Sequence, residues 1–397
     1  AGNGDHQGSG RVGGDGVMAK LGEVCLINPK SCALRDDTEV SFVPMTKVGE
    51  CGEFDASEIK HYSEVKKGFT NFQNDDILFA KITPCMENGK GAIAQNMKNG
   101  VGFGSTEFHV LRPDTDKITS EWLYYLTTWK TFRQEAERNM TGSAGQKRVP
   151  KTFLKNYVVN LPEIDTQKNE SKILRKVDDL ISLRKQQLAK LDELVKARFV
   201  EMFENSLWPN TSLNDICSEI VDCPHSTPKY EGNLEHPAIR TTEIKKGYID
   251  WDSMKYVSEE EYQKRIKSLK PVPGDIVYGR EGTYGNAAII PDGYEFCLGQ
   301  RVMLFRPNKT KCISAYVLYA ILSDHVKRQA DEKNVGATVP HVNVADAKQF
   351  DVVLPPLSIQ NQFAAFVERV DQQKQTVQQS LEKLELMKKA LMQEYFG

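Results

Sequence analysis

The residues of this sequence whose types suit chemistry are concentrated in a few polar loops punctuated by glycine. One loop, Asp222–Tyr230 (DCPHSTPKY), contains a histidine, a lysine and several hydroxyl groups, and another, Gly274–Ile289 (GDIVYGREGTYGNAAI), contains an arginine, a threonine and tyrosines. Such side chains form hydrogen bonds with base edges and phosphates, and glycine lets the backbone approach a duplex closely. These loops therefore predict recognition of nucleic acid.

A third loop, Thr141–Lys151 (TGSAGQKRVPK), adds a cluster of basic residues. Its counterpart later in the chain, Val335–Asn343 (VGATVPHVN), has a histidine and an asparagine but has lost the basic pair. Because charged loop residues are also commonly solvated and contact nothing, each position is a hypothesis. The candidate DNA-binding residues are Lys81, Gln146, Lys147, Arg148, Lys151, His225, Ser226, Thr227, Lys229, Tyr230, Arg280, Thr283, Tyr284, His341 and Asn343.

The motifs of the common enzyme active sites are missing. The glycines of Gly100–Gly104 precede a strand-like segment where a nucleotide-binding motif needs a helix, and Gly279–Gly285 (GREGTYG) lacks the Lys-Ser/Thr ending of a phosphate loop. The sequence also lacks the Asn-Pro-Pro-aromatic tetrapeptide of adenine methyltransferases, the HExxH and GxSxG motifs, and a nuclease-like set of acids. We therefore expect no catalytic residue in this chain.

A metal site is not expected either. The eight cysteines include no C-x2-C pair, which favours reduced thiols in a cytosolic protein over a disulfide framework. Cys217, Cys223, His225 and His236 are close in sequence, but their spacing differs from the usual zinc patterns.

The composition is typical of a soluble, globular chain with more than one domain. A length of 397 residues predicts two or three domains, and no apolar run reaches the length of a membrane span, so we expect a cytoplasmic protein without membrane contact. Residues 1–18 are rich in glycine and predict a disordered tail or a cloning remnant. A net charge of −2 gives the whole chain no attraction to phosphate, which argues against a simple DNA-binding protein.

The sequence repeats itself with an offset of about 193 residues. The phrase LPEIDTQKNE (Leu161–Glu170) returns as LPPLSIQNQF (Leu354–Phe363), 193 residues later. Other landmarks recur in the same order with offsets between 190 and 199: LGEVC and LNDIC, DILFAK and DIVYGR, LRP and FRP, and the VP pairs at Val149 and Val339. Insertions and deletions in loops cause such drift between two copies of one fold, so we predict a tandem duplication.

Each copy has the pattern of an α+β domain. The predicted strands are DILFAKI, EFHVLRP and NYVVNLP in the first copy and GDIVYGR, RVMLFRP and FDVVLPP in the second. One amphipathic helix lies between the last two strands of each copy, with Ser120 or Ser314 at its predicted N-cap. The predicted domains cover 19–163 and 205–355.

A long helix is predicted after each domain, over 164–204 and 356–397. From Lys168 to Phe203 there is neither glycine nor proline, and apolar residues recur close to an a/d heptad stripe, which the second copy repeats without a gap. One such stripe fits a helix lying on its own domain, but two matched stripes favour an antiparallel pair that relates the domains by a pseudo-twofold axis. The stripe residues are Leu174, Val177, Ile181, Leu188, Leu191, Val195, Met202, Val367, Val370, Leu381, Leu384, Leu391 and Tyr395.

Together these features resemble the specificity (S) subunit of type I restriction-modification systems. The resemblance covers about Lys20–Gly397 and is carried by the LP…Q ending of each domain, the GDI…R.GT.G segment, the D..H.TP.Y loop and the two long helices. It implies two α/β target recognition domains that each read half of a split double-stranded DNA sequence. It also implies a coiled-coil spacer that fixes the distance between the half-sites and docks two methyltransferase (M) subunits.

The resemblance further implies restriction (R) subunits, with S-adenosylmethionine, ATP and Mg bound by the partners and no cofactor bound by this chain. The first copy departs from the pattern at Lys81–Ile93 (KITPCMENGKGAI), so Arg280 is better supported as a DNA contact than Lys81. Two other interpretations of the residues stay open: a free-standing two-domain DNA-binding module of another modification system, and a coiled-coil adaptor that binds no DNA.

Overall fold

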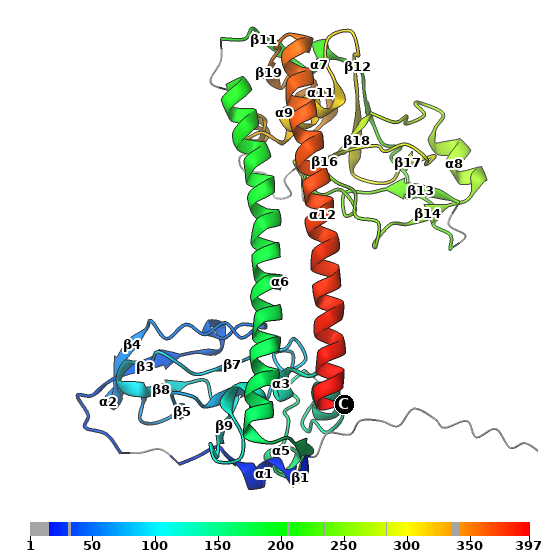
Figure 1. The fold of residues 1–397 in the computed structure, drawn as a ribbon. Helices are drawn as coiled ribbons and strands as arrows, with labels where there is room; N and C mark the ends of the chain where they lie inside the picture. The colour runs from blue at the N-terminus through cyan, green and yellow to red at the C-terminus, as the bar shows by residue number, and fades with distance from the viewer. Residues whose placement is uncertain are drawn as a thin grey trace, which may run out of the picture. The chain divides into compact units, whose positions relative to one another are not determined.

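The computed structural model describes residues 16–30, 33–143, 145–204, 207–232, 235–282, 284–334 and 341–397 (Figure 1). The chain forms two compact units. The first unit comprises the chain up to Leu183 together with Leu381–Gly397, and the second unit comprises Arg184–Ser380. Each unit contains one α+β domain and a part of each of two long helices.

The first unit is built on two four-stranded sheets. One is antiparallel and has the order β2-β9-β6-β7. The other has the order β4-β3-β8-β5, in which β3 and β8 run parallel. The strands are β1 (Val17–Lys20), β2 (Cys25–Ile27), β3 (Glu39–Val43), β4 (Ile59–His61), β5 (Thr70–Gln73), β6 (Ile77–Ala80), β7 (Gly91–Ile93), β8 (Val101–Gly104), β9 (Phe108–Pro113) and β10 (Val158–Leu161).

The strand β1 pairs antiparallel with β10, so that Val17 lies opposite Leu161 and Met18 lies opposite Asn160. The prediction of a tail over residues 1–18 is therefore wrong for Val17 and Met18, because the backbone of the strand before the long helix pairs with them. Residues 1–15 lie outside the part of the chain that the structure describes.

The second unit repeats the antiparallel sheet of the first. The order is β12-β18-β15-β16, and Gly279 pairs with Val302 as Ala80 pairs with Phe108. A three-stranded sheet, β14-β13-β17, accompanies it. The strands are β11 (Asn210–Ser212), β12 (Cys217–Asp222), β13 (His236–Ile239), β14 (Tyr256–Val257), β15 (Ile276–Gly279), β16 (Ala287–Ile289), β17 (Cys297–Leu298), β18 (Val302–Pro307) and β19 (Asp351–Val353).

One buried ion pair recurs in the two antiparallel sheets. Asp76, only 1% exposed, accepts two hydrogen bonds from Arg112, at 2.8 and 2.7 Å. Asp275 accepts two from Arg306, at 2.9 and 2.7 Å. The DI and RP landmarks of the sequence are thus the two ends of one contact, in which a planar guanidinium matches a carboxylate.

Each domain has two helices where the sequence predicted one. The first pair is interrupted at Trp129 and the second at Ser323, both with extended backbone. Ser323 accepts a hydrogen bond from the N–H of Val326 and so caps a new helix, while Trp129 packs on Phe396. The helices are α1 (Leu21–Val24), α2 (Tyr62–Val65), α3 (Ser120–Thr128), α4 (Lys130–Arg138), α5 (Lys151–Asn156), α7 (Leu213–Ile216), α8 (Glu259–Arg265), α9 (Ser314–Leu322), α10 (Asp324–Lys333) and α11 (Val344–Lys348).

The predicted serine N-caps are also wrong by one residue. Thr119 caps α3, and its hydroxyl accepts from the N–H of Trp122, while Ile313 occupies the N-cap of α9 and makes no side-chain cap. Ser120 and Ser314 are the first helical residues. Ser314 instead donates to the carbonyl of Gly274, 2.7 Å away, which ties α9 to the turn before β15.

The two long helices are α6 (Ile164–Phe199), which continues as a π-helical turn over Val200–Glu204, and α12 (Leu357–Phe396). They begin 193 residues apart, as the gap-free repeat predicted. Each predicted stripe residue is buried or half-buried, and Phe199, Phe363, Val377 and Met392 are buried with them. No helix among the described residues is both long and apolar enough to cross a lipid bilayer.

Segments of the two helices run antiparallel within each unit. In the first unit Nζ of Lys388 in α12 lies 2.6 Å from Oδ1 of Asp178 in α6. In the second unit Nζ of Lys374 lies 2.5 Å from Oδ1 of Asp192. The helix ends are anchored in aromatic clusters of the domains. Phe396 packs on Trp122 with ring centroids 4.8 Å apart.

In the second unit the corresponding anchor is Phe203, which is 193 residues earlier than Phe396. Its ring lies 5.0 Å from that of Tyr316 and 5.3 Å from that of Phe363. Burial of large aromatic side chains stabilises such joints by about 3 kcal/mol or more per ring. Each long helix is therefore part of a domain core and not an appendage.

Candidate nucleic-acid interface

Three loop segments of the second unit meet at one end of the antiparallel sheet. Arg280 follows β15, Arg301 precedes β18, and His341–Val342 come shortly before α11. The N–H of Arg280 donates to the carbonyl of Arg301, and the N–H of Val342 donates to the carbonyl of Arg280, both at 2.9 Å. We call these three segments the loop clamp of the second unit. The clamp holds candidate side chains at defined positions beside the sheet.

Arg280 is held within this clamp by acidic neighbours. Its Nη1 lies 3.1 Å from Oδ2 of Asp222, and its Nη2 lies 3.8 Å from Oε1 of Glu281. The side chain is only 14% exposed. A contact of Arg280 with DNA stays a prediction, and such a contact would compete with the ion pair to Asp222.

The loop Asp222–Tyr230 lies beside this clamp. His225 is exposed, with Nε2 3.6 Å from Oδ2 of Asp222. The hydroxyl of Thr227 accepts a hydrogen bond from Gln300, the residue before Arg301, at 2.8 Å. The contact with Gln300 places this loop next to the clamp segment that contains Arg301.

A buried arginine, Arg265, holds the middle of the loop Asp222–Tyr230 in place. Arg265 donates to the carbonyl of Ser226 at 3.2 Å and to the carbonyl of Gly299 at 2.8 Å. Lys229 is exposed, whereas Tyr230 is half-buried with the ammonium of Lys255 4.9 Å from its ring centroid. Of these candidates, Ser226 and Lys229 present polar groups to solvent, while Tyr230 has mainly a packing role.

Three further candidates of the second unit have different surroundings. The hydroxyl of Tyr284 donates to Asp331. Asn343 is the N-cap of α11, where its side-chain oxygen accepts from the N–H of Asp346 at 2.8 Å. Thr283 lies outside the described residues. The structure therefore gives Tyr284 and Asn343 intramolecular partners, and their contact with DNA stays a prediction.

The first unit contains the same clamp with other side chains. The N–H of Lys81 donates to the carbonyl of Glu107, and the N–H of Val149 donates to the carbonyl of Lys81, both at 2.9 Å. Lys81 therefore corresponds to Arg280, Glu107 to Arg301, and Arg148 to His341. We call Lys81, Glu107 and Arg148–Val149 the loop clamp of the first unit.

This correspondence corrects one part of the sequence alignment. The VP pair at Val149 was matched with the pair at Val339, but the backbone hydrogen bonds make Val342 the counterpart of Val149. Pro150 and Asn343 then occupy the same N-cap position, before α5 and α11. The offset becomes 193 residues, as it is for the long helices, and the VP match is coincidental.

Arg148 forms a forked ion pair with Glu107, through Nε and Nη2 at 2.9 Å each. Hydrogen bonds from Arg148 lower the pKa of Glu107, and those to Glu107 raise the pKa of Arg148, so both groups are charged at neutral pH. Lys81 is half-buried, whereas Gln146, Lys147 and Lys151 are exposed. No ion pair of Lys147 or Lys151 occurs among the described residues.

The histidines and cysteines considered for a metal have other roles. His236 is stacked on Tyr262, with ring centroids 4.0 Å apart, and its Nε2 lies 2.7 Å from Glu259. Cys217 and Cys223 are buried. The part of the chain that the structure describes contains no group of three or more His, Cys, Asp or Glu side chains with metal-binding geometry.

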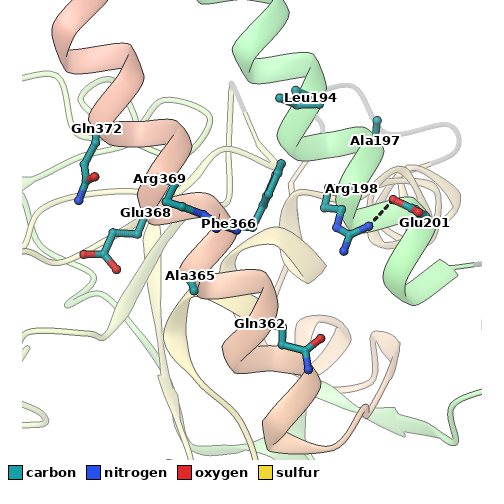
Figure 2. Close-up of a pocket in the computed structure, with 10 residues that line it drawn as sticks. All are labelled: Leu194, Ala197, Arg198, Glu201, Gln362, Ala365, Phe366, Glu368, Arg369 and Gln372. Carbon is teal, nitrogen blue, oxygen red and sulfur yellow. Dashed lines mark hydrogen bonds and ion pairs between the residues drawn. The ribbon is translucent and has the colours of Figure 1, made fainter.

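A groove of about 820 Å³ lies between α6 and α12 in the second unit (Figure 2). Figure 2 shows Phe366 and Leu194 along it, together with the ion pair of Arg198 with Glu201, at 2.7 Å. The groove is open and mixes apolar side chains with charges of both signs. Such a surface suits a protein partner better than a small molecule.

Sequence reasoning missed Asp222 as a partner of Arg280, and it missed Glu107 and Arg301 as members of the clamps. Glu107 and Arg301 each lie six residues before the proline of the LRP or FRP landmark, so the repeat itself placed them in register. Both residues lie at the start of predicted strands, EFHVLRP and RVMLFRP, and not in the polar loops that indicated a binding site.

Comparison with known proteins supports the resemblance. The family model for the type I restriction modification DNA specificity domain matches the chain twice, over residues 15–193 and 206–386. The chain is 33% identical over 302 residues to the specificity subunit of the type I restriction enzyme EcoAI of Escherichia coli. The aligned region covers 70% of this chain and 49% of that protein. Identity to the corresponding EcoEI subunit of Escherichia coli is 44% over 145 residues, covering 36% and 24%.

The chain thus spans about half the length of the EcoAI subunit and about a quarter of the EcoEI subunit. The putative MjaX specificity subunit of Methanocaldococcus jannaschii is 24% identical over 378 residues, covering 89% of this chain and 83% of that protein.

Solved structures share the fold. The S subunit of a type I restriction-modification system from M. genitalium superposes with a TM-score of 0.58 at 12% identity over 98% of both chains. A chain from a structure concerned with complex assembly and conformational transition of the type I R-M system gives a TM-score of 0.61 at 18% identity, over 96% of this chain and 98% of that one. Because the family model matches both halves and together covers most of the sequence, the chain belongs to the family of type I restriction modification DNA specificity domains, as a tandem pair of them.

Proposed function

We propose that this chain is the DNA-recognition subunit of a type I restriction-modification assembly and that each unit reads one half of a bipartite double-stranded target. The observation that carries the proposal is the loop clamp, which recurs with the same two backbone hydrogen bonds but presents different side chains in the two units. Reading two half-sites requires such an arrangement, because base-edge contacts specify sequence whereas phosphate contacts only position the protein.

The charge distribution of the chain supports DNA binding that depends on partner subunits. Lys147 and Lys151 are exposed within three residues of Arg148, and Lys229 is exposed two residues after Thr227, so all three suit phosphate contacts. The net charge of −2 gives little sequence-independent attraction, and Asp222 and Glu107 already neutralise two arginines. Tight binding therefore depends on partner subunits that close around the duplex.

The long helices are the proposed docking site for two methyltransferase subunits. Large apolar side chains of α6 and α12 stay exposed, among them Leu180, Leu183 and Leu386 of the first unit and Leu194 of the second. Large apolar side chains that stay exposed on a helix suit burial by a protein partner. Restriction subunits complete the proposed assembly, and the partners bind S-adenosylmethionine, ATP and Mg. This chain is its non-catalytic subunit, in the cytoplasm.

Methylome sequencing of cells with and without this chain tests the proposal. A bipartite adenine-methylation motif should disappear when the chain is removed and return when it is restored. Purified alone, the chain should neither methylate nor cleave a duplex, and either activity in the isolated chain would contradict the proposal.

Two binding measurements separate the proposal from the other interpretations. Specific retention of a labelled duplex by the isolated chain at physiological salt would favour a free-standing DNA-binding module. Indifference of the chain to DNA in the presence of the methyltransferase subunits would favour an adaptor without a DNA-binding role.

A further inference from the structure

The residue that precedes the long central strand of each antiparallel sheet occupies the same backbone position in both units. Glu107 lies before β9 and Arg301 before β18, and each carbonyl accepts a hydrogen bond from the residue that follows β6 or β15, at 2.9 Å. The side chains, however, have opposite hydrogen-bonding character, because guanidinium only donates and an ionised carboxylate only accepts.

Arg301 is presented to solvent from an unusually constrained backbone. Its side chain is 67% exposed, and its φ of 60° lies in the left-handed region that residues other than glycine rarely adopt. Its carbonyl accepts two hydrogen bonds, from the N–H of Arg280 and from the hydroxyl of Thr241 at 2.6 Å. Nε lies 3.1 Å from Oε2 of Glu281, which orients the guanidinium. Arg301 is thus far more accessible than Arg280.

The side chain of Glu107 is also held in one orientation by neighbouring residues. The fork of hydrogen bonds from Arg148 fixes its carboxylate, and 25% of the side chain stays exposed. An ionised carboxylate has about four lone-pair sites, so the two bonds to Arg148 leave capacity for a donor from outside the protein. Arg148 also balances the charge of Glu107, which reduces its repulsion by DNA phosphates.

We propose that Arg301 and Glu107 are specificity-determining residues of their domains, with Arg301 reading a guanine and Glu107 a base that offers an exocyclic amino group, cytosine by preference. Arginine matches O6 and N7 of guanine with two hydrogen bonds, and a carboxylate accepts from N4 of cytosine. The inference rests on the proposed function and extends it to single positions. Arg280 and Arg148 then act as positioning residues, through the clamp backbone and through the fork.

Variants at Arg301 test the second unit in the assembled complex with its methyltransferase subunits. Arg301→Gly suits the left-handed backbone and removes the side chain, so preference at one base pair of one half-site should fall about 5- to 150-fold. Arg301→Lys should keep part of the preference for guanine. Lys309→Ala is the matched control, since Lys309 is exposed and follows the same strand at its other end.

Glu107→Gln tests the first unit with almost no change in shape. A glutamine amide pairs with N6 and N7 of adenine, so one position of the other half-site should move from cytosine toward adenine. The half-site that the second unit reads should stay the same, which makes each molecule its own control. Thermal melting of each variant chain, within a few degrees of the wild type, shows that the fold is kept.

Methylome mapping and duplex binding by the variant complexes then decide. Unchanged half-sites with wild-type discrimination in Arg301→Gly and Glu107→Gln would overturn the inference. Affinity that falls evenly over all sequences would also overturn it, because that result assigns phosphate contacts to these residues. A wild-type complex that methylates no bipartite site would contradict the proposed function itself and the inference with it.

Discussion

The side-chain oxygen of Gln167 accepts a hydrogen bond from the backbone N–H of Thr119, at 2.9 Å. The amide nitrogen of the same side chain donates to the carbonyl oxygens of Lys117 and Pro162, at 2.9 and 2.8 Å. Gln167 is completely buried at the start of α6. One side chain therefore joins the long helix to the loop before α3 and to the end of the last strand.

Gln360 repeats this arrangement in the second unit. Its oxygen accepts from the N–H of Ile313 at 3.0 Å, and its nitrogen donates to the carbonyls of Lys311 and Pro355, at 3.0 and 2.8 Å. The recurring LP…Q phrase is thus the joint between each domain and its helix, which explains why the sequence states it twice.

Gln167→Ala should lower the free energy of unfolding by about 3 kcal/mol, because it leaves buried backbone groups without partners. Gln167→Glu should lower the free energy of unfolding at least as much at neutral pH, because a carboxylate oxygen, which cannot donate, then faces the carbonyl oxygens of Lys117 and Pro162. Denaturant unfolding measures both effects. Asn169→Ala, an exposed position on the same helix, should stay within about 0.5 kcal/mol of the wild type, and equal losses for Gln167→Ala and Asn169→Ala would contradict the joint.

Arg112→Ala should destabilise the first unit by about 3–5 kcal/mol, because it leaves the carboxylate of Asp76 buried without its cation. A double variant, Asp76→Asn with Arg112→Met, removes both charges and should be less destabilised than Arg112→Ala. Unfolding of the single and double variants measures the difference. If the double variant were the less stable of the two, the desolvation argument would be wrong.

The sequence predicted the elements that repeat and missed the helix breaks, which the repeated pattern does not show. The tandem domains, the central strands and the 193-residue register of the helices follow from apolar periodicity and from two matched copies. The breaks at Trp129 and Ser323 could not be predicted, because Trp129 is held by the distant Phe396 and the pattern on both sides of Ser323 is helical.

The candidate site was predicted at the level of loops and only partly at the level of residues. The loops around Arg280 and Arg148 do meet the other candidate segments, as the clamps show. The ion pairs of Arg280 with Asp222 and of Arg148 with Glu107 join residues far apart in the sequence, so no local pattern reveals them. Arg301 was not recognised because it opens the segment RVMLFRP, which was assigned to a strand, although it is the more accessible arginine.

Buried cysteines, among them Cys25, Cys217, Cys297 and Cys312, should resist thiol alkylation in the folded protein. Burial raises the pKa of the Cys25 and Cys297 thiols to about 12 and that of Cys312 to about 11, and it also raises the pKa of Cys217. At pH 8 these thiols are protonated and inaccessible, whereas Cys51 is exposed and should react before them. Mass spectrometry of peptides after alkylation, with and without denaturant, measures the order. Rapid native labelling of Cys25 would contradict its burial.

Lys147→Ala should weaken DNA binding by the assembled complex evenly over all sequences. Lys147 is exposed beside the clamp of the first unit, and a phosphate-contacting lysine contributes charge without reading a base. The slope of log affinity against log salt should become shallower by about one. Lys130→Ala, at the exposed start of α4, is the control and should leave the slope as it is. An unchanged slope in both variants would show that the loop does not reach the phosphates.

The length of the long helices should set the non-specific gap between the two half-sites. Loops of the two copies differ in length, whereas α6 and α12 begin 193 residues apart and keep their stripe in phase. An insertion inside a paired helix shifts each later stripe residue, but a whole heptad restores the phase. In the second unit Asp192 lies beside Lys374, so the antiparallel register places Leu188 opposite Gln378.

A matched pair of heptads inserted after Leu188 and after Val377 should therefore keep the helix contacts and lengthen the gap by about three base pairs. Seven residues at a rise of about 1.5 Å lengthen the helix by about 10 Å, and one base pair spans about 3.4 Å. The half-site sequences should stay the same. A heptad in one helix alone serves as the control and should abolish modification, because the opposite stripe then lacks partners. Methylome mapping measures the gap, and the original gap with full activity in the matched variant would show that the domains themselves determine the spacing.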